Sequence, residues 1–203
     1  DSLSGGVGHD ELYGGAGNDV LDGGVMADTP NLDIFVGGAG RDTIYAGAGE
    51  ADYFSYGGAS ESTSQGRDII FGADFDEEDV FELGVRPTEV LPTLGGVLNS
   101  ASFNSDLTAA FNGYFTAGGG VQAALFDPYA GNQNIDGRLF LVVDANDDGA
   151  YSAGADYVIE LADAVNIDKF NAGDFIQLVD DYRALVSSES TWNGYGRLGQ
   201  SAI

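Results

Sequence analysis

In the N-terminal part of the chain, one large apolar residue recurs at a fixed distance behind a glycine-rich stretch. Residues 5–13, 14–22 and 37–45 read G-G-V-G-H-D-E-L-Y, G-G-A-G-N-D-V-L-D and G-G-A-G-R-D-T-I-Y, which share the pattern G-G-x-G-x-D-x-U-x with U apolar. The glycines suit tight turns, and each strand half directs one side chain inward: Leu12, Leu21, Phe35 and Ile44. Short strands repeated in series between tight glycine turns predict a parallel β-helix type of coil.

Two further copies of the pattern are altered. One copy begins with Gly23 and Gly24 and finishes at residues 31–36, so residues 26–30 are interpreted as an inserted loop in which Asp28 is solvated. The last copy, residues 46–56, has gained a residue before Asp52 and ends in the strand-like run Y-F-S-Y. Terminal repeats of a solenoid are commonly atypical because they cap the stack, and we interpret this copy as such an end.

The chain beyond residue 57 shows mainly short runs of β type. The runs at 121–126, 138–143 and 156–161 predict strands. Residues 86–96 are expected to be extended, because Pro87 and Pro92 prevent a long helix. Apolar residues at near-helical spacing within 102–115 predict a short helix packed on the sheet. The tail, residues 177–203, differs in composition, with a short helix predicted at 179–186 and a Ser/Gly-rich end.

Charge changes this picture more than any other property of the composition. The 203 residues include 33 Asp and Glu but only 7 Lys and Arg, which gives a formal net charge of −26. Such a chain repels itself when compact, so bound cations are the natural partners, whereas nucleic acid and anionic membrane surfaces are disfavoured. Cysteine is absent, which excludes disulfides and thiolate metal sites. No apolar run is long enough to span a membrane.

The repeats themselves offer cation ligands. Stacked turns would bring loop carbonyls and Asp carboxylates together, and coordination by oxygen alone suits Ca²⁺, which takes about six to eight oxygen ligands. A flexible Gly-rich linker and a metal-free solenoid are the alternatives. A linker would not keep Asp and a bulky apolar residue at fixed offsets, so we expect several calcium ions.

A second candidate site lies between the strands predicted at 138–143 and 156–161. Asp144, Asn146 and Asp148 alternate and are followed by Gly149, which is the core of a calcium loop. The twelfth position, where an EF-hand has Glu, is Ala, and Asp156 comes next. Because the flanks are strands, this is a hairpin loop that could bind Ca²⁺ through Asp144, Asn146, Asp148 and Asp156. A plain Asn/Asp/Gly hairpin turn is the alternative.

The nine-residue repeats resemble the RTX (repeats-in-toxin) family of hemolysin-type calcium-binding proteins. The resemblance implies an all-β fold, a calcium-stabilised parallel β-roll in which each coil uses two repeats. Calcium would then lie between a loop and the loop two repeats later, so Asp10 would share an ion with the third repeat and Asp19 with the loop of Asp42. Asp33 and Asp52, which follow insertions, are weaker candidates. The implied ligands are Gly6, Gly8, Asp10, Gly15, Gly17, Asp19, Asp33, Gly38, Gly40, Asp42, Gly47 and Asp52.

The resemblance extends downstream of the repeats. The runs at 68–71 and 79–83 are similar to the segment that closes the roll in serralysin-type secreted proteases. Residues 119–176 are similar to C-terminal regions of secreted RTX proteins, with a closing strand at 167–176 that ends in D-F-I. The implied organisation is a roll at 1–57, a capping β region with one or two short helices at 58–176, and a tail at 177–203 that serves as secretion signal, linker or partner-binding extension.

These observations predict a calcium-binding RTX module of a secreted bacterial protein, located outside the cell or at its surface, that folds on Ca²⁺ after type I secretion. Two alternatives remain open. One is an adhesin or surface-layer module that self-associates or binds polysaccharide through calcium, and the other is the C-terminal module of a secreted protease or lipase. Catalysis within this chain is not expected, because His9 is its only histidine and no G-x-S-x-G or H-E-x-x-H motif is present.

Overall fold

The structure is a computed structural model, and it describes residues 1–24, 32–47, 51–76, 79–132 and 138–177. The predictions made for Asp28 and for the tail helix at 179–186 lie outside the described residues. The described part consists mainly of strands, with one short α-helix. No helix within it is long and apolar enough to cross a membrane.

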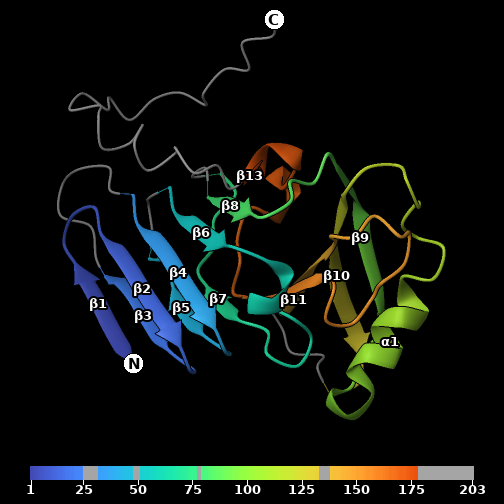
Figure 1. The fold of residues 1–203 in the computed structure, drawn as a ribbon, viewed down its shortest axis with the longest axis horizontal. Helices are drawn as coiled ribbons and strands as arrows, with labels where there is room; N and C mark the ends of the chain where they lie inside the picture. Colours follow the sequence, from blue (N-terminus) through green and yellow to red (C-terminus); the bar gives the residue numbers. More distant parts are fainter. Residues whose placement is uncertain (25–31, 48–50, 77–78, 133–137, 178–203) are drawn as a thin grey trace, which may run out of the picture.

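The N-terminal strands alternate between two parallel sheets, as expected for a roll (Figure 1). One sheet contains in order β1 (Ser2–Gly6), β3 (Val20–Gly24), β5 (Thr43–Tyr45) and β7 (Ile69–Phe71). The other contains β2 (Glu11–Ala16), β4 (Ile34–Ala39), β6 (Tyr53–Tyr56) and β8 (Val80–Leu83). The parallel pairing runs across residue 57 without interruption, so β7 and β8 continue the two stacks that the repeats begin.

The core of the roll consists of two apolar columns that face each other. The four side chains predicted to point inward, Leu12, Leu21, Phe35 and Ile44, are at most 4% exposed. Within one column, Phe35 lies next to Phe54 and Phe54 next to Phe81 on neighbouring strands, with ring centroids 5.7 and 5.4 Å apart. Each coil therefore adds one buried aliphatic or aromatic residue to each column, and this burial stabilises the stack.

The C-terminal half extends the first sheet. Strands β9 (Glu89–Val97), β10 (Gln122–Ala130), β11 (Arg138–Asp144) and β12 (Tyr157–Ala162) follow one another in the sheet order β7-β12-β11-β10-β9. β12 runs parallel to β7, whereas β11 is antiparallel to both of its neighbours. The roll and the C-terminal strands thus share one continuous sheet.

A second core lies on the other face of this extension. Helix α1 (Phe103–Ala110), preceded by the 3₁₀ turn η2 (Ser100–Ser102), covers the sheet at the end of the molecule opposite β1 (Figure 1). Phe103, Leu107 and Phe111 pack there against the buried Phe126 and Phe140. The predicted helix at 102–115 is therefore confirmed, although it ends at Ala110 and the aromatic residues after it pack without helical structure.

The prediction of one strand over residues 167–176 is mostly wrong. The structure has the 3₁₀ turns η3 (Ile167–Lys169) and η4 (Ala172–Asp174), and only β13 (Phe175–Gln177) is a strand, paired with β8. Asn166 has a left-handed φ of 53°, and Asn171 forms a capping box with Asp174. Because Asn and Asp side chains bond to nearby backbone groups, they favour turns over a strand here. A further 3₁₀ turn, η1 (Ala59–Glu61), lies between β6 and β7.

Candidate metal centre

The turns of the roll form two rows of loops. The first row connects β1 to β2, β3 to β4, β5 to β6 and β7 to β8, and the second row connects β2 to β3, β4 to β5 and β6 to β7. Each loop ends with an Asp two residues before an inward apolar side chain. The first row ends in Asp10, Asp33, Asp52 and Asp79, and the second row ends in Asp19, Asp42 and Asp68.

Backbone hydrogen bonds hold the carboxylates of each row in register. In the second row, the N–H of Asp19 donates to Oδ1 of Asp42, and the N–H of Asp42 donates to Oδ1 of Asp68, both at 2.8 Å. The same bond links Asp10 to Asp33 at 2.8 Å, and the first row continues in this way through Asp52 to Asp79. Stacking of the coils therefore places one carboxylate directly after another along each row.

The second oxygen of several of these carboxylates has no partner. Oδ2 of Asp10, Asp19 and Asp42 is buried and has no hydrogen-bond partner among the described residues. Each of these oxygens faces the first glycine of its own repeat. An added Cβ would lie 2.6 Å from Oδ2 of Asp10 at Gly5, and 2.8 Å from Oδ2 of Asp19 at Gly14. A buried carboxylate oxygen without a partner is costly, and a bound cation is one way to stabilise it.

A glycine carbonyl lies beside the unpartnered oxygen of Asp19, because an added Cβ at Gly14 would lie 2.6 Å from the Gly37 carbonyl oxygen and 2.8 Å from Oδ2 of Asp19. At Gly38 and Gly40, where φ is +91° and +145°, an added Cβ would overlap the carbonyl oxygens of Gly15 and Gly17 in the loop below. The N–H of Gly17 donates to the carbonyl of Ala39 at 2.8 Å, which ties the same two loops together. Asp19 and the loop at 37–42 therefore lie in contact, and an ion shared between them, which the resemblance implied, stays a prediction.

The first row is arranged similarly, but its loops are only partly described. Gly6 pairs with Gly24, so the first and third repeats stack, while residues 25–31 and 48–50 lie outside the described ranges. Gly8 has a φ of +116° and no neighbour within 4 Å of an added Cβ, and Gly47 has a φ of +113°. The structure brings the carboxylates of Asp10 and Asp33 together through the backbone bond of Asp10.

Burial and like charge act together on the rows. Burial raises the pKa of Asp42 and of Asp33, against the lowering effect of the N–H bond that each accepts, and the charges of Asp19 and Asp10 raise these values further. Within the described residues, Asp10, Asp33 and Asp42 form no ion pair with Lys, Arg or His. A divalent cation would oppose both effects, because it replaces repulsion between neighbouring carboxylates with attraction.

The donor set limits the kind of ion. Among the described residues, no three Asp, Glu, His or Cys side chains converge on one point. An ion in the rows must therefore take most of its ligands from backbone carbonyls, with one or two carboxylates. An all-oxygen set of this kind fits Ca²⁺, a hard cation that accepts carbonyl ligands in flexible geometry.

The hairpin loop between β11 and β12 is arranged differently. Asp144 and Asp156 are 1% and 0% exposed, and burial raises the pKa of both, that of Asp156 to about 7. Yet each carboxylate oxygen of Asp144, Asp148 and Asp156, and Oδ1 of Asn146, accepts a hydrogen bond from the loop itself. The donors are the N–H groups of Ala145, Asp148, Gly149, Ala150 and Ser152, the Ser152 hydroxyl and the Asn146 amide. This geometry suits the plain-turn alternative, and calcium at the hairpin stays a prediction.

A cluster of charged residues at the junction of the two halves was missed by sequence reasoning. Glu160 on β12 is fully buried, and the guanidinium groups of Arg67 and Arg138 lie 2.9 and 3.0 Å from its carboxylate. Arg41, from the loop at 37–42, lies 4.0 Å away. Because these residues come from the roll and from β11 and β12, the cluster joins the two halves. Residues so far apart in the sequence gave no local signal of this contact.

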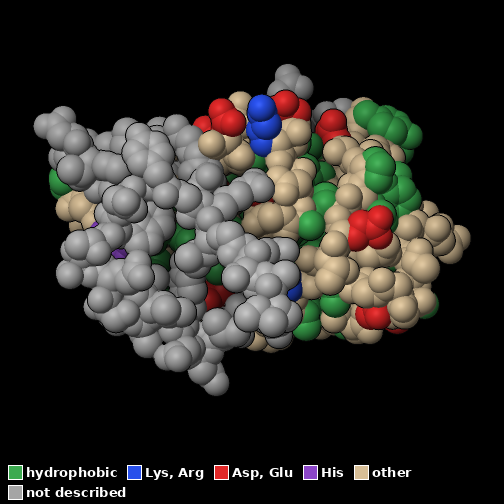
Figure 2. Space-filling view, turned by 90° about the horizontal axis from the view of Figure 1, so that it is seen from above, with side chains coloured by type: hydrophobic (Ala, Val, Ile, Leu, Met, Phe, Trp, Pro, Cys, Tyr) green, Lys and Arg blue, Asp and Glu red, His purple; other side chains and the backbone are tan. Residues whose placement is uncertain are grey.

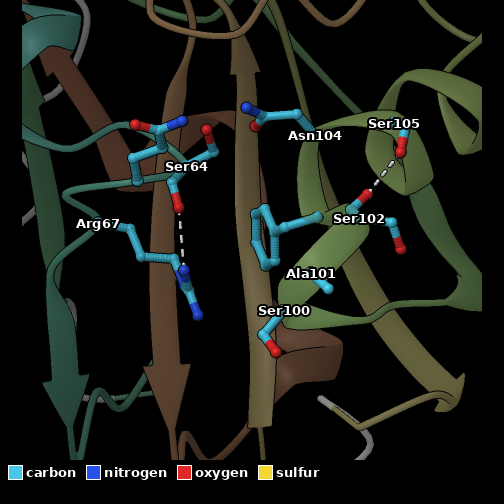
Figure 3. Close-up of a pocket in the computed structure, with 9 residues that line it drawn as sticks. Ser64, Arg67, Ser100, Ala101, Ser102, Asn104 and Ser105 are labelled. Atoms are coloured by element: carbon cyan, nitrogen blue, oxygen red, sulfur yellow. Dashed lines mark hydrogen bonds between the residues drawn. The ribbon is translucent and has the colours of Figure 1, made fainter.

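Arg67 also borders a cavity of about 560 Å³ between the loop at 57–68 and the start of α1 (Figure 3). Its guanidinium lies 4.3 Å from the ring centroid of Phe103 and donates to the Ser64 carbonyl at 2.9 Å. The residues lining the cavity carry hydroxyl and amide groups but no carboxylate or histidine. The candidate ligands for a cation therefore lie in the loop rows and not in this cavity.

Comparison with known families agrees with the geometry of the rows. Residues 1–30 and 32–59 match the family model described as the RTX calcium-binding nonapeptide repeat, in four copies. No curated protein matches the chain. The match ends before Asp68 and Asp79, which continue the aspartates of the second and first loop rows in the structure.

Proposed function

We propose that this chain, whose residues 1–59 are RTX calcium-binding nonapeptide repeats, is a module that binds several calcium ions and folds as it binds them. The observation that carries the proposal is the set of buried carboxylate oxygens without partners in the loop rows, on Asp10, Asp19 and Asp42. Each lies against the first glycine of its own repeat, where a side chain would not fit, and Oδ2 of Asp19 also lies beside the Gly37 carbonyl of the neighbouring loop. Calcium supplies the positive charge that these oxygens otherwise lack.

The residues of the chain couple this binding to folding. Without calcium, the 33 acidic residues, which far exceed the 7 basic ones, oppose compaction. Each row of loops also brings one Asp carboxylate close to the next, coil by coil. The loops that would hold an ion exist only when coils are stacked, so the free energy of binding adds to that of folding. At a free calcium concentration one hundred times the dissociation constant, each site would contribute about 2.7 kcal/mol.

This coupling suits a protein that is exported before it folds. In calcium-poor cytoplasm the roll would remain unfolded and could pass through a type I secretion channel, whereas calcium outside the cell would fold it. The exposed Asp and Glu side chains, which outnumber Lys and Arg on the described surface seen in Figure 2, favour solubility in the extracellular medium. The same module could serve a surface adhesin or stand at the end of a secreted hydrolase.

Circular dichroism of the whole chain tests the proposal. In excess EGTA we expect the β-sheet signal to fall, and titration with Ca²⁺ should restore it with a stoichiometry above one ion per chain. Mg²⁺ is the control, because it prefers smaller octahedral sites and releases its waters reluctantly, so it should not restore the signal at the same concentration. A β-sheet signal that does not change in EGTA would contradict the proposal.

A further inference from the structure

The loop at 57–68 contains a repeat that is hidden by an insertion. Gly66, Arg67 and Asp68 are followed two residues later by Ile70, which repeats the order Gly40, Arg41, Asp42 and Ile44. The structure aligns them, since Ile44 pairs with Ile70 across β5 and β7. Residues 58–65, which include η1, stand where the clean repeat has Ala39 alone. This loop is thus the third member of the second row.

Contacts in this loop match those of the clean repeats beneath it. Oδ1 of Asp68 accepts the N–H of Asp42 at 2.8 Å, as Oδ1 of Asp42 accepts the N–H of Asp19 at the same distance. Gly66 lies over the Gly40 carbonyl, with an added Cβ 3.4 Å from its oxygen. The loop at 57–68 therefore contacts the loop at 37–42 in the same way as the loop at 37–42 contacts residues 14–19.

Asp68 also shares the feature that marks the other candidate ligands. It is fully buried, and its Oδ2 has no hydrogen-bond partner of normal geometry in the described part of the chain. The hydroxyl of Tyr56 lies close to this carboxylate. Tyr56 occupies the position that Gly37 has in the clean repeat, because Phe54 pairs with Phe35. Glu61 adds a second carboxylate in the same loop, where it accepts the N–H of Gly57 at 2.8 Å.

The corresponding residue of the first row provides a contrast. Asp79 is 2% exposed, and its Oδ1 accepts the N–H of Asp52 at 2.8 Å, as Asp68 does for Asp42. Its Oδ2, however, accepts the N–H of Asp74 at 2.7 Å. Asp68 and Asp79, the last aspartates of the two rows, are alike in position and burial, but only Asp79 has a backbone donor for Oδ2.

We propose that Asp68 is the carboxylate ligand of a further calcium ion, held between the loops at 37–42 and 57–68 and outside the matched repeats. The proposal rests on the calcium-binding function proposed above. Backbone carbonyls of the loop at 37–42 would supply other ligands, and Glu61 a second carboxylate. Asp79, whose oxygens both have backbone donors, holds no ion.

Counting bound calcium by native mass spectrometry tests this on the whole chain. D68N, which is isosteric, should bind one ion fewer than the wild type, and the matched variant D79N should bind the same number as the wild type. An unchanged count in D68N would overturn the proposal, as would equal losses in both variants. If the wild type bound no calcium, the proposed function itself would fail, which is a separate result.

A second measurement decides the question if D68N does not fold. Tb³⁺ replaces Ca²⁺ in oxygen sites and emits when a nearby tyrosine is excited. Because Tyr56 lies beside Asp68, Y56F should lower the sensitised Tb³⁺ emission, while Y129F on the exposed surface of β10 should leave it unchanged. Emission from Y56F equal to that of the wild type would overturn the proposal.

Discussion

The roll loops and the β11–β12 hairpin loop are both rich in Asp and Gly, but they differ in whether both oxygens of an Asp carboxylate accept N–H groups. In the roll, Oδ2 of Asp19 and Asp42 is buried without a partner. In the hairpin, both oxygens of Asp144 and Asp156 accept N–H groups from the loop itself, at 2.6 to 3.2 Å. The hairpin therefore stabilises the charges of Asp144 and Asp156 itself, although Oδ1 of Asp147 is buried there without a hydrogen-bond partner, whereas the roll leaves buried carboxylate oxygens that the proposed calcium ions would stabilise.

This difference follows from where the N–H donors point. A loop that bends back on itself within one segment, as at Asp144 to Gly149, directs its own N–H groups at the first carboxylate. A solenoid loop uses the N–H of its Asp to hold the next coil, and its glycines present carbonyls to the neighbouring loop. Similar residue types thus predict a dependence on calcium in one place and a self-sufficient turn in the other.

The largest expected effect comes from the stacked glycines of the roll. G40A would force a side chain into a φ of +145° and against the Gly17 carbonyl. We expect it to cost several kcal/mol, about 2–6 by summing backbone strain and overpacking, and to weaken calcium binding. G154A in the hairpin, with a φ of +84° and open space around it, should cost only the strain, about 1–3 kcal/mol.

Thermal unfolding in calcium and in EGTA measures both effects. G17A is the control within the roll, because its φ of +118° is also positive but no atom lies within 4 Å of the added Cβ. If G17A and G40A lost the same stability in calcium, close stacking of the loops would not be what the roll requires.

A smaller effect should separate the two regions by its dependence on calcium. D42N removes a carboxylate that has no donor for Oδ2, so in saturating calcium we expect a loss of about 2–4 kcal/mol, on the scale of one bound ion. In EGTA the same substitution should be neutral or stabilising, since it removes a buried charge. D144N should instead cost about 1–3 kcal/mol in both conditions, because it weakens bonds within the loop.

Urea unfolding of the two variants, each with and without calcium, gives the comparison directly. D22N, at an exposed position on β3, is the control for loss of one negative charge. Equal calcium dependence of D42N and D144N would show that the hairpin also relies on an ion, as the calcium-loop hypothesis for Asp144, Asn146, Asp148 and Asp156 requires.

The sequence predicted the roll well because its information is local. Each repeat specifies its own turn and its own inward residue, so the burial of Leu12, Leu21, Phe35 and Ile44 followed without knowledge of the rest of the chain. The strands at 138–143 and 156–161 were also predicted, but not that β12 would join β7. That pairing connects residues about 90 positions apart, and a parallel partner is not encoded in the pattern of either strand.

The candidate site was predicted less completely. The pattern identified the aspartates of the nine-residue copies, but it missed Asp68, because the insertion at 58–65 separates it from Gly57. It also could not distinguish a calcium loop from a turn at residues 144–156, since the deciding property is which N–H group faces each oxygen. The strand predicted at 167–176 failed where Asn166 and Asn171 form turns.

The central claim is that calcium stabilises the roll and that the hairpin region does not need it. Hydrogen exchange of backbone amides, followed by mass spectrometry in calcium and in EGTA, tests it most directly. In EGTA we predict that β2 to β5 lose protection first, while β10, β11 and the hairpin keep theirs, because a second core around Phe103, Phe126 and Phe140 holds them. Full protection of β2 to β5 in EGTA, or earlier opening of the hairpin, would contradict the account.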